Sequence, residues 1–242
     1  MAPWLVSDKN DVVRTPVKLH VKRVGEGPPI ILTHGMAVSS ATWAAQVELL
    51  AKDHTVITWD LRGHGSSERP DGTEAYSREN VLGDLDEIVA SLDVDAGPPV
   101  LVGHSLGGYL SLAFALTRPV QLRALILLST GPGYRDDSAR AKWNVMITHD
   151  DSPLDIPSHV LHIGTQEDAL VIDGLSEIKV PTLLIVGERD RHYHGGVLYM
   201  ERKLVDARSV TIPGAGHNPQ ETHVSEVNAA IEAFLGELPP LR

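Results

Sequence analysis

The segment Gly103-His-Ser-Leu-Gly107 places a serine, Ser105, between two glycines, with an apolar run before it and an apolar helical pattern after it. A serine at the apex of a sharp strand-to-helix turn has a strained backbone, which is tolerated when its neighbours lack bulk. Its hydroxyl then projects from the carboxyl end of the sheet, where open α/β sheets bind ligands. The pattern predicts a nucleophilic Ser105; the competing interpretation is a glycine-rich helix start with an N-capping serine.

A serine nucleophile needs a base, and the base needs an acid that orients it. His217 lies in a loop of small residues after the strand-like run 209–212 and before the last helical pattern. Asp190 comes just past the buried-strand pattern 182–186, so its carboxylate is expected at the same sheet edge. The chain order Ser105, Asp190, His217 is the order expected when the nucleophilic serine lies on a strand-to-helix turn of an open α/β sheet. We therefore predict that these three residues form a catalytic triad.

Other titratable residues compete for these roles. Glu188 lies two residues before Asp190, while Asp136 and Asp137 follow the preceding strand pattern and are weaker candidates for the acid. His192 and His194 form an H-x-H pair, but no third ligand lies near them in the sequence, so we expect no metal site. We expect no other cofactor.

The tetrahedral oxyanion of acyl transfer needs preorganised N–H donors, each contributing about 10²–10³ in rate. The amide of Leu106, next after the serine, is one candidate. The loop after the apolar run 30–33 should supply the other, and its residues His34-Gly35-Met36 lead us to nominate the amide of Met36. A plain turn would also need Gly35, so this assignment depends on Ser105.

Apolar runs alternate with helical patterns along most of the chain. Runs without polar alternation predict strands covered on both faces, and their alternation with helices predicts a mostly parallel sheet flanked by helices. The sequence therefore predicts an α/β fold in a single domain, 1–242, with a half-buried antiparallel strand at the N-terminal edge around 17–22. The strand runs are 30–33, 55–59, 100–102, 124–128 and 182–186, and the helical patterns are 43–50, 81–92, 106–116 and 224–234.

The stretch 131–179 breaks this alternation. It is rich in Asp, Pro and His, has short helical patterns near 139–147 and 166–172, and shows no clear strand. A long loop inside a compact domain is usually functional, often a lid; the alternative is a surface excursion that only covers a sheet edge. We predict a short cap, in which Trp143, Met146 and Ile147 either line the substrate pocket or form the packing core of the cap itself.

Composition limits the partners of the chain. Lys and Arg number 21 against 32 Asp and Glu, which gives a formal net charge of −11. This negative charge disfavours binding to nucleic acid and to anionic membranes. The absence of cysteine excludes disulfides and thiol nucleophiles. No apolar window is long enough to span a bilayer and the first ten residues lack a signal-peptide pattern, so we expect a soluble, cytoplasmic protein. The sequence carries no signal for an oligomeric state.

These residues together resemble the α/β-hydrolase superfamily, from about Gly25 to Leu235. The resemblance implies that 60–66 is a structural turn beside the pocket and that 131–179 stands where the family has a variable cap. Met36 departs from the His-Gly-Gly-Gly run of some lipases, which disfavours bulky tertiary-alcohol esters. The chain is similar in general appearance to small microbial carboxylesterases and enol-lactonases. The matching motifs are His34-Gly35, Asp60-Leu-Arg-Gly-His-Gly-Ser66, Gly103-His-Ser-Leu-Gly107, Gly187-Glu-Arg-Asp190 and Gly216-His217.

The nucleophile narrows the activity that the resemblance implies. Haloalkane dehalogenases and epoxide hydrolases of this superfamily carry an aspartate where this chain has Ser105, so serine implies acyl transfer. We expect Ser105 to attack a small carboxylic ester or lactone, His217 to take its proton, and Asp190 to hold the imidazole. The alternatives are a carbon–carbon bond hydrolase on a ketonic substrate, a lyase or cofactor-free oxygenase with His217 as base, and a slow-turnover receptor for small molecules.

Overall fold

The computed structural model describes residues 15–149 and 154–241. Within them, seven strands form one sheet in the order β1-β3-β2-β4-β5-β6-β7, in which only β1 runs antiparallel to its neighbour. The predicted α/β fold with a mostly parallel sheet is confirmed. The strands are β1 (Val21–Val24), β2 (Pro29–Thr33), β3 (Thr55–Trp59), β4 (Val100–His104), β5 (Ala124–Leu128), β6 (Thr182–Gly187) and β7 (Ala207–Ile212).

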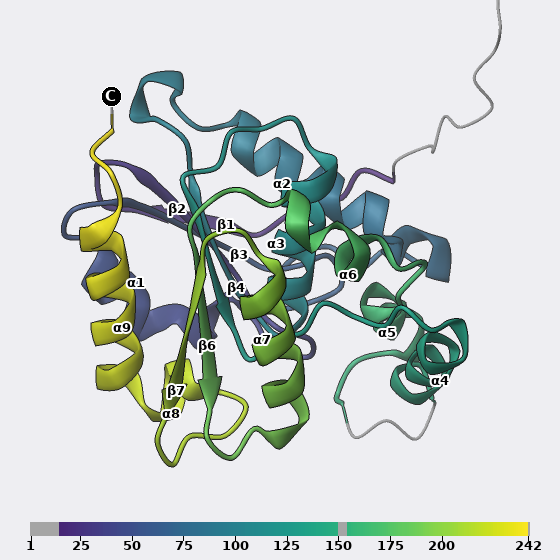
Figure 1. The fold of residues 1–242 in the computed structure, drawn as a ribbon. Helices are drawn as coiled ribbons and strands as arrows, with labels where there is room; N and C mark the ends of the chain where they lie inside the picture. The colour runs from purple at the N-terminus through teal and green to yellow at the C-terminus, as the bar shows by residue number, and fades with distance from the viewer. Residues whose placement is uncertain (1–14, 150–153, 242) are drawn as a thin grey trace, which may run out of the picture.

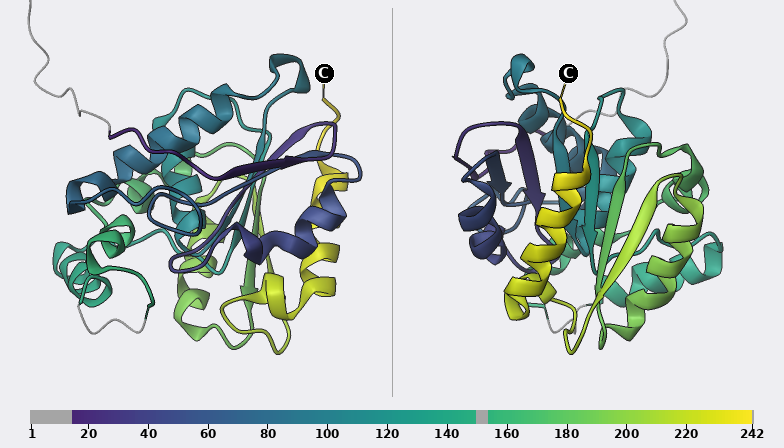
Figure 2. Two further views of the ribbon diagram at one scale, coloured as in Figure 1. Left: turned by 180° about the vertical axis from the view of Figure 1, so that it is seen from behind. Right: turned by 60° about the vertical axis from the view of Figure 1, so that its left-hand side comes forward.

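Helices cover both faces of the sheet (Figures 1 and 2). On one face, α1 and α9 pack against strand residues such as Ile30 and Leu32; on the other, α2, α3 and α7 pack against Ile31 and its equivalents. Successive side chains of a strand point to opposite faces, so a continuous apolar run such as β2 supplies both cores. These helices are α1 (Ala44–Leu50), α2 (Arg78–Ala90), α3 (Leu106–Thr117), α7 (Arg191–Lys203) and α9 (Val224–Glu237).

The N-terminal edge strand differs from the expectation. The antiparallel edge is present, but β1 begins at Val21, later than the alternating pattern suggests, and all four of its residues are exposed. Residues 15–20, of which Pro16 and Lys18 are exposed and the others half-buried, run beside the loop after β3. The amide of Glu68 donates to the Lys18 carbonyl, and that of Asp60 to the His20 carbonyl. The alternation of apolar and polar residues before Val21 therefore reflects packing against the loop after β3 and not pairing with a strand.

The 131–179 segment is helical and irregular where the structure describes it, with no strand in its described residues. It lies on the side of the sheet away from α1 and α9 (Figure 1). Its helices and the remaining short ones are α4 (Asp137–Ile147), α5 (Ser158–Leu161), α6 (Leu170–Gly174), α8 (Pro219–Thr222), and the 3₁₀ turns Ser40–Trp43, Thr73–Tyr76, Val94–Ala96, His162–Gly164 and Leu175–Glu177.

Candidate active site

Ser105 is the single residue between β4, which ends at His104, and α3, which begins at Leu106. Its φ of 51° and ψ of −114° put a non-glycine residue in the positive-φ region, a strained backbone that surrounding contacts must hold. The Ser105 amide donates to the Leu128 carbonyl at 2.8 Å, and the Ser105 carbonyl accepts from Thr130 Oγ1 at 2.7 Å. Its side chain makes no capping hydrogen bond, so it is not used as an ordinary N-cap.

The glycines around Ser105 are required by close backbone approach. A Cβ on Gly103 would overlap the carbonyl oxygen of Gly107, and a Cβ on Gly107 would overlap that of Thr33, at the end of β2. Helix α3 therefore starts in direct backbone contact with β2 and β4. These contacts fix the backbone position of Ser105.

A hydrogen-bonded chain joins Ser105, His217 and Asp190. His217 Nε2 lies 3.1 Å from Ser105 Oγ, and His217 Nδ1 lies 2.9 Å from Asp190 Oδ2. With the carboxylate accepting from Nδ1–H, Nε2 is free to accept the serine proton. Asp190 follows β6 and His217 follows β7; the two loops touch backbone to backbone, since a Cβ on Gly187 would overlap the Gly216 carbonyl.

The electrostatics of the chain keep Asp190 ionised. Asp190 is only 8% exposed, and burial alone would raise its pKa, but the hydrogen bond and charge of His217, together with smaller contributions from Ser129 and His104, hold the pKa below its ordinary value. The carboxylate is thus charged at neutral pH and can stabilise an imidazolium.

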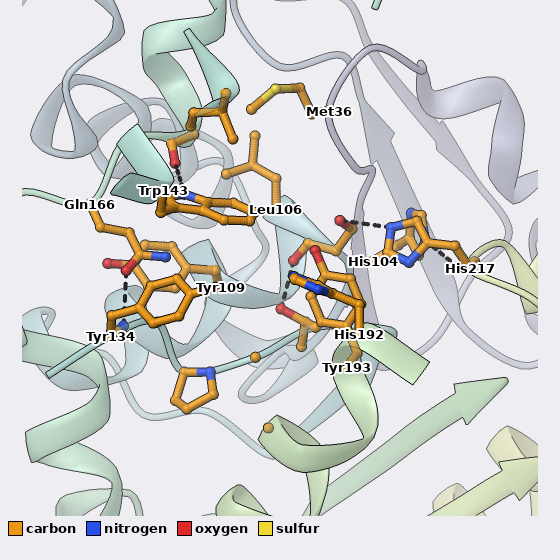
Figure 3. Close-up of a pocket in the computed structure, with 18 of the residues that line it drawn as sticks. Met36, His104, Leu106, Tyr109, Tyr134, Trp143, Gln166, His192, Tyr193 and His217 are labelled. Atoms are coloured by element: carbon orange, nitrogen blue, oxygen red, sulfur yellow. Dashed lines mark hydrogen bonds between the residues drawn. The ribbon is translucent and has the colours of Figure 1, made fainter. Parts of the chain in front are cut away.

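Two other rings flank His217. The ring of Tyr193 stacks on it with centroids 4.9 Å apart and planes at 23°, and the ring of His104 lies 5.0 Å away on a tilted plane (Figure 3). His104 Nε2 also bonds to the His217 carbonyl at 2.9 Å. Burial, and then the nearby His217, lower the pKa of His104 to about 4, so its ring is neutral near pH 7 and accepts a proton less readily than an ordinary imidazole.

Sequence reasoning missed Tyr193. It comes from the first turn of α7, a helix that buries only Val197 and Met200 and contains two glycines, so it gives no strong apolar period. One signal was available: Tyr193 stands three residues after Asp190, and a residue so placed, on the helix that follows the acid, faces the same sheet edge.

The backbone at Gly35 and Met36 lies against the serine. A Cβ on Gly35 would come within 3.2 Å of Ser105 Cβ and 2.8 Å of His104 Nδ1. Met36 and Leu106 both border the cavity beside Ser105. Leu106 is the first residue of α3, so its N–H is one of the donors that have no partner within the helix. The nominated oxyanion donors are therefore adjacent to the nucleophile.

Ser105 and His217 line a cavity of about 590 Å³, of the size that holds a small organic ligand. Trp143 and Ile147 from α4 line it, and Trp143 Nε1 donates to the Gly164 carbonyl at 3.0 Å. The expectation for Met146 was wrong: its side chain is 57% exposed and does not border the cavity. On a helix, residues 143 and 147 are one turn apart and share a face, whereas 146 points away from 147 by about 100°.

The competing acids have structural partners. Glu188 Oε2 accepts from the Gly214 amide at 2.8 Å, Asp136 Oδ1 caps α4 by accepting from the Ala139 amide at 2.8 Å, and Asp137 pairs with Arg140. None of the three reaches His217 in a recorded contact. In the described ranges 15–149 and 154–241, no three His, Asp or Glu residues gather as a metal site.

The turn 60–66 is held by its own carboxylate. Asp60 accepts from the Ser40 amide at 2.7 Å through Oδ1 and from the Ser66 amide at 2.9 Å through Oδ2. A Cβ on Gly65, whose φ is 50°, would overlap the same carboxylate. The segment thus ties two loops together beside the site.

Comparison with known proteins identifies the family of the fold. The family described as the alpha/beta hydrolase fold matches residues 28–155. The chain belongs to this family. It is 28% identical over 265 residues to a pimeloyl-[acyl-carrier protein] methyl ester esterase of Xylella fastidiosa strain M12, covering 91% of this chain and 100% of the relative.

Solved structures show the same fold. A thermophilic esterase from Thermogutta terrifontis, with malate bound, superposes with a TM-score of 0.79 at 27% identity, over 91% of this chain and 94% of that one. MenH from S. aureus superposes with a TM-score of 0.79 at 23% identity, over 90% and 98% of the two chains, a likeness that bears on the fold alone. Among the described residues, no helix has the length and apolar character needed to cross a membrane.

Proposed function

We propose that this protein is a serine hydrolase that cleaves a small carboxylic ester or lactone through an acyl-enzyme. The observation that carries the proposal is the chain of hydrogen bonds from Asp190 through His217 to Ser105 at the wall of a cavity. Support comes from family membership and from similarity to esterases in both sequence and structure.

In the first half of the reaction, Ser105 Oγ attacks the substrate carbonyl carbon while His217 Nε2 takes the hydroxyl proton. The oxyanion that forms is held by the amides of Leu106 and Met36. As the tetrahedral intermediate collapses, the C–O bond to the alcohol breaks and His217 returns its proton to the leaving alkoxide. In a lactone, the alcohol stays attached to the acyl group.

In the second half, water takes the place of the alcohol. His217 removes a proton from water, the resulting hydroxide attacks the acyl carbon, and the proton passes to Ser105 Oγ as the ester bond to the enzyme breaks. The products are one acid and one alcohol for each water consumed. Asp190, ionised throughout, stabilises the imidazolium in both halves.

The 131–179 segment acts in this proposal as a cap, and we use that name for it below. Its α4 contributes Trp143 and Ile147 to the cavity lining. Figure 3 shows Trp143 on the side of the cavity opposite His217. Their apolar surfaces would bind the hydrocarbon part of the substrate and displace water from it.

The test compares Ser105→Ala with Ser111→Ala, which changes a serine inside α3 whose hydroxyl donates to the Gly107 carbonyl. Removing the nucleophile should lower kcat/KM for p-nitrophenyl butanoate by about 10⁴-fold or more. The Ser111 variant should keep activity within a few-fold. Full activity in a folded Ser105→Ala protein would contradict the proposal.

Product analysis separates the other chemistries. Hydrolysis in H₂¹⁸O should place one labelled oxygen in the released acid. Turnover of a substrate without uptake of solvent oxygen would indicate lyase chemistry, and oxygen drawn from O₂ would indicate an oxygenase. Saturable binding without turnover would indicate a receptor.

A further inference from the structure

The side-chain amide of Gln166, in the cap, is held in one orientation. Gln166 is 8% exposed, and its Oε1 accepts from the Tyr134 amide at 3.0 Å, which establishes which end of the amide is oxygen. Its backbone is held by Asn144. The backbone N–H of Gln166 donates to Asn144 Oδ1 at 2.8 Å, and Asn144 Nδ2 donates to the backbone carbonyl of Gln166 at 3.0 Å.

A glycine closes the chain onto this amide. Gly133 has a φ of 81°, and a Cβ there would lie 2.7 Å from Gln166 Oε1. The loop that leaves β5 thus packs directly on the Gln166 amide, which a larger residue would displace. The bond from the Tyr134 amide and the contact with Gly133 fix the Gln166 side chain, while the two bonds to Asn144 fix its backbone.

The Nε2 end of this amide is left over. It has no hydrogen-bond acceptor among residues 15–149 and 154–241, and Gln166 borders the cavity. Nε2 has no partner in these residues but is not among the fully buried atoms, so a ligand in the cavity can reach it, and an acceptor on that ligand can take its hydrogen bond. Figure 3 shows Gln166, Tyr134 and Trp143 on one side of the cavity and His217 on the opposite side.

The other residues that line the cavity indicate whether the ligand group at Gln166 is charged. The described residues that border the cavity include no Asp, Glu, Lys or Arg; around the Gln166 side they are rings and aliphatic groups such as Tyr109, Trp143 and Ile172. A carboxylate or ammonium held there would lose its hydration without gaining an opposite charge. The group that meets Gln166 is therefore uncharged.

We propose that the substrate of this protein carries an uncharged acceptor oxygen, a ketone, ether or second ester, remote from the scissile carbonyl, and that Gln166 Nε2 binds it. This inference rests on the proposed hydrolase function and names its substrate class. Gln166 is then a specificity-determining residue that acts on substrate choice and leaves the chemical step to the triad.

The test uses p-nitrophenyl esters matched in length: pentanoate against 4-oxopentanoate, and hexanoate against 5-oxohexanoate, each rate corrected for its hydroxide-catalysed hydrolysis. One neutral hydrogen bond contributes about 0.5–1.5 kcal/mol, so kcat/KM for at least one oxo ester should exceed that of its alkyl partner about 2- to 12-fold. The p-nitrophenyl monoester of glutaric acid, which places a carboxylate there, should react more slowly than pentanoate. A wild-type protein that prefers neither oxo ester overturns the inference.

Variants assign the preference to Gln166. Gln166→Met, similar in length without the donor, should bring the oxo-to-alkyl ratio to about 1, because the hydrogen bond supplied the whole difference. Gln166→Glu, measured at pH 8, keeps an oxygen for the Tyr134 amide and should bring the ratio below 1. Ile172→Val, a matched change in the apolar lining, should alter both rates together and keep the ratio.

The outcomes separate the two proposals. If alkyl esters are hydrolysed and the ratio is unchanged in both Gln166 variants, the inference is wrong and the hydrolase function stands. If the folded protein hydrolyses no ester and Ser105 is not activated, the proposed function is wrong, and the inference with it.

Discussion

The turn around Ser105 and the cap border the same cavity but are held by different kinds of contact. At the turn, helix α3 is almost wholly buried and starts in backbone-to-backbone contact with β2 and β4. In the cap, α4 has no buried residue, and its position depends on side-chain hydrogen bonds such as those of Trp143 and Asn144. One wall of the cavity is fixed by main chain and the other by side chains.

The difference between the two walls suggests that the turn at Ser105 determines the chemical step and that the cap determines which substrate is bound. Backbone contacts cannot be adjusted by a rotamer change, so the backbone positions of Ser105, His217 and the proposed oxyanion donors follow from the fold itself. Side-chain contacts can be exchanged singly. The cap can therefore be changed to accept another substrate while the reacting groups stay in place.

Alanine at two glycines tests this difference most strongly. In Gly107→Ala, the new methyl overlaps the backbone oxygen of Thr33, and we expect a loss of about 3 kcal/mol or more in the free energy of unfolding. In Gly164→Ala, the methyl meets the flexible end of the Met36 side chain, which can move, so the loss should be much smaller. Thermal and urea unfolding measure both.

Gly195→Ala is the control, since nothing lies within 4 Å of a Cβ at this position in α7. It should stabilise the protein by up to about 1 kcal/mol, the helix propensity difference. Equal losses in the Gly107 and Gly164 variants would show that the two walls are equally rigid.

Buried histidines next to the turn make its stability depend on pH. Burial lowers the pKa of His34 to about 3 and that of His104 to about 4, with neighbouring His64 and His217 adding to the shifts. Below pH 6.5 the unfolded chain binds protons that the folded protein does not, so stability falls as pH drops from 6.5 toward 4. Each group contributes up to about 1.4 kcal/mol per pH unit.

Urea unfolding at pH 7.5 and 5.0 measures this dependence. In His104→Asn, the pH slope should fall by close to one proton, while the slope due to His34 remains. A wild-type protein equally stable at both pH values would mean that these rings are not held neutral.

Within the cap, Trp143 and Met146 test which face of α4 binds substrate. Trp143→Ala removes a ring that lines the cavity and a hydrogen bond to Gly164, and should lower kcat/KM for hexanoate esters about 10-fold, given about 25 cal/mol per Å² of apolar contact. Met146→Ala, on the exposed face, should change kcat/KM less than 2-fold. Equal effects would contradict the placement of α4.

The smallest effect concerns the ion pair between the cap and α2. Arg78 contacts Asp168 at 2.7 Å, and this hydrogen bond lowers the pKa of the Asp168 carboxyl, whose side chain is 49% exposed. Its stabilisation is present above the ordinary pKa of Asp and is lost as pH falls below it. Asp168→Asn should cost less than about 1 kcal/mol, because the carboxylate is half exposed to solvent, which screens the pair.

Salt provides the check on this pair, since screening should shrink the difference between Asp168→Asn and wild type in 0.5 M NaCl. Glu237→Gln, in an exposed pair with Arg208 far from the cap, is the matched control. A loss of several kcal/mol would show that the cap is held by this ion pair.

Sequence reasoning succeeded where backbone determines the structure. Buried parallel strands require unbroken apolar runs, and the sharp turn at Ser105 requires Gly103 and Gly107, so both leave direct signals. The chain order of Ser105, Asp190 and His217 follows from the order of the strands. These features place the predicted triad residues within hydrogen-bonding distance.

Sequence reasoning failed where the orientation of a side chain depends on contacts with segments distant in the sequence. The pattern of α4 predicts a helix, but with no buried residue it does not say which side meets the cavity, so Met146 was assigned with Ile147. Gln166 gives no signal, because its orientation depends on Tyr134, Asn144 and Gly133, which meet only in the folded chain.

The most direct test of the account is labelling of the native protein with a fluorophosphonate, followed by peptide mapping. An activated serine attacks the phosphorus and expels fluoride, whereas ordinary serines do not react. The account predicts one adduct, on Ser105, with labelling lost in Ser105→Ala and strongly reduced in His217→Ala. A folded protein that takes up no label, or takes it up at another serine, would contradict it.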